Sequence, residues 1–483
     1  MLINISKKTK IVCTIGPSTD NYDAVLKLIN AGMNVMRVNF SHGSYDEHIK
    51  KVQIARQIEK DTGCLIPVML DTKGPEIRTH FFENDSATIL KNDIVRISMK
   101  EVLGTAKKFS ITYPELYDDV QVGNIIKLDD GNLDLLITEK DDINRELVTI
   151  AQNTHTVTNR RGVNVPYIKL SMPFISEKDA NDIKFGCEND FDLIAASFVR
   201  REQDILDVKE LCKKYNRPHM KIIAKIENPE GVSNIDKIIE VADGIMVARG
   251  DLGVEIPAEE VPVIQKMIID KCRLAGKPVI TATQMLDSMK KYPRPTRAEV
   301  SDVANAVTQG TDAVMLSAES ASGDYPIEAT TMQSKIASTM EKYLDYEKLA
   351  QEAFDTSEKT NNDAIAISVA NTAALIGAKL IVCFSESGST ALRISKSRPV
   401  CNILAISNDR RVCLDLALSW GVNSLYAPFV PQLIEEMEVL ALVKAHMLGI
   451  KAGEPIIVTG GTPTGAGKTN FMKIINVNEI KDI

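Results

Sequence analysis

Short runs of apolar residues alternate with longer amphipathic stretches through the first two thirds of the chain. The runs richest in β-branched residues occupy positions 10–15, 34–39, 67–71, 193–198, 221–226, 244–248, 278–282 and 313–316. Helical periodicity is clear between them at 21–31, 45–62, 205–215 and 262–275. This alternation is typical of parallel strands joined by crossover helices. Eight strands close a barrel, so we predict an α/β protein built on a (β/α)8 TIM barrel rather than an open sheet.

A long stretch of different character, residues 75–172, separates the third and fourth predicted strands. Strand-like runs stand at 93–97, 123–128 and 133–138, and Asp130-Gly131 and Arg161-Gly162 are turn signals. We therefore predict a small β-barrel-like domain inserted in one βα loop as a lid. Insertions on that face of a barrel usually carry function.

A second α/β region follows the eighth predicted strand. A polar helical stretch at 343–360 leads to strand-like runs at 379–384, 402–407, 423–427, 455–459 and 471–477. The 483 residues are too many for one compact core. We expect a barrel formed by residues 1–74 and 173–343, the inserted domain at 75–172, and a C-terminal α/β regulatory domain at 344–483.

Charge and cysteine usage narrow the classes of protein. The formal net charge is -8, without the basic patch that nucleic-acid binding requires. No run approaches the ~18 apolar residues of a membrane span, and the first residues do not resemble a signal peptide. The eight cysteines are scattered, with no CxxC pair and no zinc spacing. We expect a cytoplasmic protein with reduced, mostly buried thiols.

Polar residues collect where the predicted strands end, which is where barrel enzymes place their chemistry. They are Arg37, Asn39, Ser41, His42, Asp71, Thr72, Lys73, Lys225, Glu227, Arg249, Asp251, Thr283, Ser317 and Glu319, with Gly250 between Arg249 and Asp251. Lys225 and Glu227 are two residues apart, so they point to the same side of an extended strand. Alone, such a pair is more often a structural salt bridge. Asp251, at the next strand end, supplies a second carboxylate, and two convergent carboxylates are a typical Mg²⁺ arrangement.

A second group of oxygen-bearing residues, Asn39, Ser41, Asp71 and Thr72, suits a weakly held monovalent cation. Taken alone, helix caps and turns explain such residues better. Arg37 is the expected anion clamp, because its guanidinium matches phosphate oxygens, although an ordinary surface charge is the simpler alternative.

Long motifs occur along almost the whole chain in one order: TKIVCTIGPS, MNVMRVNFSHG, LDTKGPEIR, KIENPEG, DGIMVARGDLGVEIP, TATQMLDSM and PRPTRAEVSDVANAV. Together they resemble the pyruvate kinase family. The resemblance implies phosphoryl transfer from phosphoenolpyruvate to ADP, which gives pyruvate and ATP as the final step of glycolysis. It also implies dependence on Mg²⁺ (or Mn²⁺) and K⁺, and a homotetramer.

The resemblance assigns roles to residues at the strand ends. Glu227 and Asp251 match the Mg²⁺ ligands, and Lys225 matches the cation that stabilises the transferring group and the enolate. Arg37 and the backbone around Gly250 would hold substrate. Thr283 would contact substrate and relay a proton, since the pKa of a hydroxyl is too high for it to be the ultimate acid.

Further matches concern K⁺ and the nucleotide. Asn39, Ser41, Asp71 and Thr72 match the K⁺ ligands, and Glu76 is similar to the K⁺-dependent subgroup. Asn39, His42, Arg78 and Arg161 match positions near the nucleotide phosphates. Arg161 departs from the lysine common in the family, and Ala318 in LSAES stands where the family commonly has glycine.

Two loops of the C-terminal region suggest phosphate binding. Ser385, Ser387, Gly388, Ser389 and Thr390 follow an apolar strand and open a predicted helix, where backbone N–H groups can cradle a phosphate or simply form a cap and turn. In the family this loop binds a phosphorylated allosteric effector. Residues 461–469 look like a P-loop, but Thr462 stands where the first glycine is required, so we reject a Walker ATPase.

Two other functions are compatible with parts of the pattern. A Mg²⁺-dependent lyase or mutase acting on pyruvate-like substrates also uses carboxylates at a barrel mouth, but the long insertion and the K⁺-like group argue against it. A non-catalytic effector-binding scaffold would not need Lys225, Glu227, Asp251 and Thr283 together.

Overall fold

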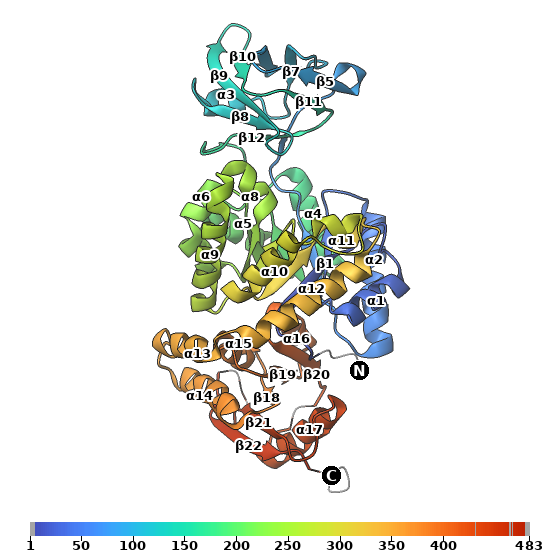
Figure 1. Ribbon diagram of the computed structural model, residues 1–483, viewed down its shortest axis with the longest axis vertical. Helices are drawn as coiled ribbons and strands as arrows, with labels where there is room; N and C mark the ends of the chain where they lie inside the picture. Colours follow the sequence, from blue (N-terminus) through green and yellow to red (C-terminus); the bar gives the residue numbers. More distant parts are fainter. Residues whose placement is uncertain (1–4, 430, 463–464, 466, 479–483) are drawn as a thin grey trace.

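The computed structural model describes residues 5–429, 431–462, 465 and 467–478. Three parts follow one another along the long axis of the molecule (Figure 1). The inserted domain lies at one end, the barrel in the middle and the C-terminal domain at the other end.

The central part is a closed barrel of parallel strands in the order β1-β17-β16-β15-β14-β13-β3-β2. Its strands are β1 (Lys10–Thr14), β2 (Val35–Asn39), β3 (Val68–Asp71), β13 (Leu193–Ala196), β14 (Lys221–Ile226), β15 (Gly244–Ala248), β16 (Val279–Ala282) and β17 (Ala313–Leu316). The predicted TIM barrel is confirmed. These strands could be recognised because they are covered on both faces and therefore read as continuous apolar runs.

Helices surround the barrel and carry clear end signals. They are α1 (Tyr22–Ala31), α2 (Tyr45–Thr62), α4 (Glu177–Glu188), α5 (Glu202–Lys214), α6 (Pro229–Ser233), α7 (Ile235–Val241), α8 (Arg249–Glu255), α9 (Val261–Ala275), α10 (Arg297–Gln309), α11 (Ala318–Ala321) and α12 (Pro326–Met340). In α2, Ser44 and Glu47 form a capping box, and Gly63 ends the helix with φ 72°. Thr296 and Glu299 cap α10 in the same way.

The inserted domain is a curled sheet around its own apolar core. It contains β4 (Ile77–Arg78), β5 (Ser86–Ile89), β6 (Ile94–Ser98), β7 (Lys108–Ser110), α3 (Leu116–Asp119), β8 (Ile125–Leu128), β9 (Leu133–Asp141), β10 (Glu146–Ala151), β11 (His155–Thr158) and β12 (Gly162–Asn164). The sheet order is β4-β12-β8-β9-β10-β6-β7, with β11 and β5 as a separate pair. The turn at Asp130-Gly131 is confirmed between β8 and β9. The turn at Arg161-Gly162 is wrong, because Gly162 already belongs to β12 and the left-handed residue is Arg160, with φ 56°.

The C-terminal domain has a five-stranded sheet in the order β20-β19-β18-β21-β22. Its elements are α13 (Tyr346–Asp355), α14 (Asn361–Ile376), β18 (Leu380–Phe384), α15 (Ser389–Lys396), β19 (Asn402–Ser407), α16 (Arg410–Asp415), β20 (Val422–Tyr426), α17 (Ile434–Met447), β21 (Pro455–Gly460) and β22 (Phe471–Asn476). The predicted helical stretch at 343–360 is shorter than expected, since α13 ends at Asp355. The P-loop-like segment 461–469 connects two antiparallel strands; its residues 463, 464 and 466 lie outside the described residues.

The C-terminal domain closes the end of the barrel opposite the inserted domain (Figure 1). Leu418 is 2% exposed and belongs to the same apolar cluster as Val12, Met69 and Met246 of the barrel strands. Lys10 of β1 donates a hydrogen bond of 2.5 Å to the carbonyl oxygen of Val422. The barrel interior is thus completed by a residue of another domain.

The predictions about membrane spans and about cysteines can be compared with the described part of the chain. None of its helices is both long and apolar enough to cross a membrane. All eight cysteines are free, and seven of them are buried, as expected.

Candidate active site

A chain of alternating charges lies at the carboxyl ends of β2, β3 and β14. Asp71 accepts from Arg37 Nε at 2.6 Å through Oδ2, and its Oδ1 lies 3.1 Å from Lys225 Nζ. Lys225 Nζ is also 3.0 Å from Glu227 Oε1. Arg37 is buried, so the alternative of an ordinary surface charge is wrong. The salt bridge considered for Lys225 and Glu227 does exist, but as one part of a larger buried network.

The network keeps its central members charged. Burial would raise the pKa of Asp71, but the attraction of Arg37 and Lys225 outweighs it and holds that pKa below its ordinary value. Burial would likewise lower the pKa of Lys225, but Asp71 and Glu227 raise it above that of a free lysine. Lys225 is therefore a fixed ammonium throughout the neutral range.

Glu227 and Asp251 form the carboxylate pair that the sequence indicated. Glu227 is 1% exposed and accepts a 2.6 Å hydrogen bond from the backbone N–H of Phe198. Its pKa is raised to about 7, first by burial and further by Asp251, against the attraction of Lys225. Asp251 lines a cleft that solvent can reach, yet partial burial by the surrounding protein still raises its pKa.

These two carboxylates suit a divalent cation. Neighbouring carboxylates with raised pKa values retain a proton readily, and a metal ion can take the place of that proton. Over the described residues, no cluster of three or more His, Cys, Asp or Glu side chains is placed to hold a metal. Mg²⁺ is commonly bound through one or two carboxylates together with substrate oxygens and water, which is compatible with this pair.

The helix α8 carries Gly250 and Asp251 and is fixed where it begins. Arg249 donates 2.7 Å hydrogen bonds to both carboxylate oxygens of Asp302. The N–H of Gly250 donates to Thr283 Oγ1 at 2.7 Å, and that hydroxyl donates to the carbonyl oxygen of Ala282 at 2.6 Å. The hydroxyl proton of Thr283 is therefore engaged, and a relay role requires that the O–H turn away from Ala282 by rotation about the Cβ–Oγ1 bond.

Ser197 belongs to the polar network around Lys225, and the sequence analysis missed it. Its hydroxyl accepts from Lys225 Nζ at 2.7 Å and donates to the carbonyl oxygen of Thr72 at 2.6 Å. The predicted strand 193–198 absorbed Ser197, whereas β13 ends at Ala196. A serine at the carboxyl end of a barrel strand was the available signal.

The oxygen-rich group is only partly assembled by direct contacts. Asn39 and Asp71 are partners in the register of β2 and β3, and Thr72 follows Asp71. Asn39 Oδ1 accepts from the N–H of Ser41 at 3.0 Å, and Thr72 Oγ1 accepts from the N–H of Ser197 at 3.1 Å. The bond at Asn39 is the turn bond of the simpler interpretation, whereas the bond at Thr72 joins the ends of β3 and β13. Both lie in the same place as a potential cation site.

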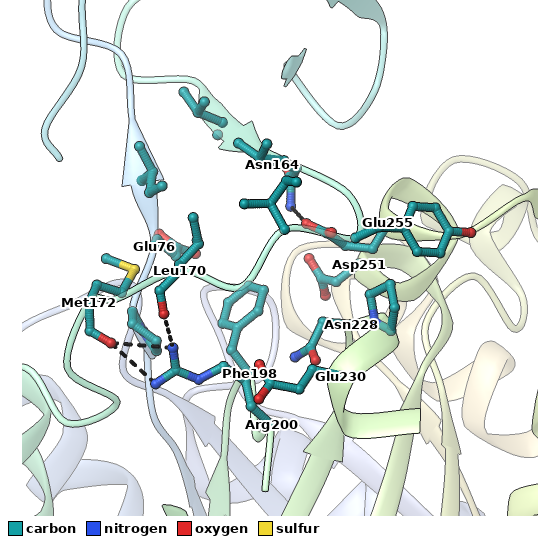
Figure 2. Close-up of a pocket in the computed structure, with 18 of the residues that line it drawn as sticks. Glu76, Asn164, Leu170, Met172, Phe198, Arg200, Asn228, Glu230, Asp251 and Glu255 are labelled. Carbon is teal, nitrogen blue, oxygen red and sulfur yellow. Dashed lines mark hydrogen bonds between the residues drawn. The ribbon is translucent and has the colours of Figure 1, made fainter. Parts of the chain in front are cut away.

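A cleft of about 550 Å³ lies between the inserted domain and the barrel. Figure 2 shows it with Asp251 and Glu255 on the barrel side and Asn164 on the inserted domain. Arg78 and Arg161 also line the cleft.

The predicted nucleotide residues differ in their surroundings. Arg78 is paired with Glu76 at 2.7 Å, and Glu76 lies 3.5 Å from Lys73. Arg161 is 47% exposed and lies 3.4 Å from Asp129. His42 is exposed on the loop before α2 and is not among the residues that line this cleft.

The serine-rich loop of the C-terminal domain has the predicted strand–loop–helix geometry. It follows β18, and Gly388, with φ 80°, precedes the first residue of α15. Ser387 donates to Ser389 Oγ at 3.1 Å, and the hydroxyls of Thr390 and Thr469 are 2.5 Å apart. Ser385 is buried and directly follows the strand.

A parallel barrel with a lysine, an arginine and paired carboxylates at its mouth, below an inserted domain, defines an enzyme that acts on small anionic substrates. Residues 6–330 match the family model "Pyruvate kinase, barrel domain", and residues 363–475 match "Pyruvate kinase, alpha/beta domain". This chain belongs to the pyruvate kinase family, and it transfers the phosphoryl group of phosphoenolpyruvate to ADP.

Individual relatives agree over nearly the whole chain. A pyruvate kinase of Geobacillus stearothermophilus is 49% identical over 477 residues, which is 99% of this chain and 81% of the relative. One of Staphylococcus aureus is 47% identical over 473 residues, or 97% of this chain and 80% of the relative. The crystal structure of a pyruvate kinase from Cryptosporidium parvum superposes with a TM-score of 0.92 at 38% identity, covering 98% of this chain and 96% of the other. The lyase or mutase and the scaffold alternatives are therefore excluded.

Proposed function

We propose that Lys225 is the central catalytic residue of this pyruvate kinase and that Arg37 holds substrate beside it. The single observation that carries this assignment is the buried contact of Lys225 with Asp71, Glu227 and Ser197. A preorganised ammonium stabilises charge on the transferring phosphoryl group and on the enolate without reorganising in the transition state. Arg37 is held in the same way by Asp71 and by Thr14, 2.8 Å from its Nη1.

Glu227 and Asp251 are the proposed ligands of Mg²⁺ or Mn²⁺. When bound, the cation would neutralise charge on the substrate oxygens. The support is the raised pKa of both carboxylates. Gly250, whose N–H faces Thr283, would present backbone to the substrate next to Asp251.

Asn39, Ser41, Asp71 and Thr72 are the proposed K⁺ ligands. Three of them lie on the neighbouring ends of β2 and β3, and Glu76 leaves this side of the cleft without the extra lysine of K⁺-independent relatives. Activity measured against K⁺ at constant ionic strength tests the assignment. Turnover that does not respond to K⁺ would contradict it.

Thr283 is the proposed proton relay to the enolate, after rotation away from Ala282. For the nucleotide phosphates we assign Asn39, His42, Arg78 and Arg161. The support for Arg161 is its half-exposed side chain at the edge of the cleft, where it is held by Asp129 at 3.4 Å and donates to Thr158 Oγ1 at 2.5 Å.

The other parts of the chain have proposed supporting roles. Residues 75–172 would act as a lid, and residues 344–483 as a regulatory domain. The loop of Ser385, Ser387, Gly388, Ser389 and Thr390 would bind the phosphate of an allosteric effector, supported by the turn before α15. A homotetramer is the expected assembly, which analytical ultracentrifugation tests.

One coupled assay tests the central assignment. Purified protein should form pyruvate from phosphoenolpyruvate and ADP in a Mg²⁺-dependent manner, and Lys225→Met should lose several orders of magnitude in kcat. Near-normal turnover of Lys225→Met would overturn the role of the lysine. A panel of sugar phosphates and nucleotides in the same assay identifies the effector.

A further inference from the structure

The helix α8 is attached to the barrel where it begins and to the inserted domain where it ends. Arg249 and Gly250 make the barrel contacts, with Asp302 and Thr283. At the other end, Asn164 Nδ2 donates a 2.7 Å hydrogen bond to Glu255 Oε1 (Figure 2). Asn164 belongs to β12 of the inserted domain, so this bond spans the cleft.

Asp251 lies between these two attachments. It precedes Glu255 by four residues, and residues at that spacing lie on the same face of a helix, one turn apart. Figure 2 shows the two carboxylates close together on the wall of the cleft. A displacement of the last turn of α8 would therefore move the backbone that carries Asp251, because α8 has only seven residues.

Other residues of the inserted domain approach the same turn. Gly131, in the turn between β8 and β9, faces α8 so closely that a Cβ atom there would lie 3.5 Å from Val254 Cγ1. Burial raises the pKa of Glu255, and Lys127 of β8 partly opposes that shift, as does the bond from Asn164. The inserted domain thus rests on the end of α8, and Asn164 makes the direct polar bond.

The inserted domain is also held at its base. Arg200 donates 3.2 Å hydrogen bonds to the carbonyl oxygens of Leu170 and Met172, on the chain that returns to the barrel (Figure 2). These bonds lie at the connection between the domains. They can persist when the domain swings, whereas the bond between Asn164 and Glu255 must break if the cleft opens.

We propose that Asn164 is a positioning residue which, by binding Glu255 when the cleft is closed, fixes α8 and so sets Asp251 for metal binding. Closure of the inserted domain and affinity for the divalent cation are coupled through this bond. The inference rests on the proposed role of Asp251 as a metal ligand.

The test is Mn²⁺ binding to the full-length protein, followed by electron paramagnetic resonance without turnover. Asn164→Ala should weaken Mn²⁺ binding roughly tenfold, since partners that orient metal ligands typically contribute 10- to 100-fold in affinity. Glu255→Gln keeps the acceptor oxygen and should bind Mn²⁺ nearly as the wild type does. The double variant Asn164→Ala/Glu255→Ala should be no weaker than Asn164→Ala alone, because both changes remove the same bond.

Asn144→Ala is the matched control, because Asn144 bonds only to Asp141 in its own turn among the contacts described. It should leave Mn²⁺ binding unchanged. Hydrogen exchange should be faster around residues 125–135 and 160–168 in Asn164→Ala, with the barrel unaffected. That pattern separates an opened cleft from a misfolded protein.

Other results for Mn²⁺ binding would contradict either the coupling or the metal site. Wild-type Mn²⁺ affinity in Asn164→Ala overturns the coupling. A loss in Glu255→Gln equal to that in Asn164→Ala also overturns it, since the charge of Glu255 would then act on the metal directly. Asp251→Asn tests the underlying site: unchanged binding there refutes the metal assignment itself, whereas loss there with normal binding in Asn164→Ala refutes only the coupling.

Discussion

Ser197 offers a direct measure of how much the position of Lys225 contributes to catalysis. The serine hydroxyl accepts from Lys225 Nζ at 2.7 Å and is itself held by the carbonyl oxygen of Thr72. Ser197→Ala removes that acceptor but leaves Asp71 and Glu227 in place. The ammonium should therefore stay charged and become less well directed.

The size of the effect follows from the charge on the donor. A hydrogen bond to a charged group contributes about 1.5–3 kcal/mol, and about 1.4 kcal/mol corresponds to tenfold in rate. If the bond acts in the transition state, kcat of Ser197→Ala should fall roughly 10- to 100-fold. The KM for phosphoenolpyruvate should change much less, because Arg37 and the carboxylates are untouched.

The assay is steady-state pyruvate formation at saturating Mg²⁺ and K⁺ across a pH series. Ser320→Ala is the control, since Ser320 is equally buried at the barrel mouth and donates to the carbonyl oxygen of Thr14 at 2.9 Å. An unchanged kcat in Ser197→Ala would refute the positioning argument. A shifted pH–rate profile would refute it in another way, because it would mean that the serine tunes the charge of Lys225 rather than its direction.

Three further variants test other parts of the structure. Thr283→Val should lower kcat about a hundredfold and Thr283→Ser much less, because only serine keeps a hydroxyl for proton transfer. Turnover and the solvent isotope effect of the two variants measure the difference. Burial lowers the pKa of Lys10 from 10.5 to about 7, so between these pH values the unfolded chain binds more protons and the free energy of unfolding rises with pH. In thermal melts across this pH range, Lys10→Met should lose the part of the rise that comes from Lys10. An unaltered dependence of Tm on pH would contradict this. Leu418→Ala should destabilise the junction of the barrel and the C-terminal domain by about 2–5 kcal/mol, seen as a lower Tm, whereas a Tm equal to that of the wild type would show that the cavity collapses.

The barrel could be predicted because its physics is local to each strand. A parallel strand covered on both faces is an apolar run, and its carboxyl end is marked by the first polar residues, such as Asp71 after Leu70 or Arg249 after Ala248, with Asp251 two residues further on. Lys225, Glu227 and Asp251 could be grouped for the same reason, since neighbouring strand ends meet in a closed barrel. Once the strands were counted, these three residues could be placed together at the mouth of the barrel.

Residues that act across domains or at strand boundaries could not be predicted in this way. Ser197 was concealed by an error of two residues in the end of one strand. The bond from Asn164 to Glu255 depends on how the inserted domain is oriented over the barrel, which no local pattern encodes. Leu418 lies in the C-terminal domain, yet it fills the barrel interior, and only the assembled fold brings it there.

Two residues with strained backbone direct hydrogen bonds within the site. Phe198 has φ 57° and Thr283 has φ 68°, in a region that costs a residue with a Cβ atom of order 1–3 kcal/mol. The first conformation directs the N–H of Phe198 to Glu227, and the second places the hydroxyl of Thr283 against the N–H of Gly250. A hydrogen bond to a carboxylate contributes about 1.5–3 kcal/mol, so the bond from Phe198 can offset its strain, while the neutral bond at Thr283 contributes only about 0.5–1.5 kcal/mol. The strain at Thr283 is therefore the less compensated of the two. If the hydroxyl of Thr283 rotated toward substrate, the protein would lose only the weak, neutral hydrogen bond to Ala282.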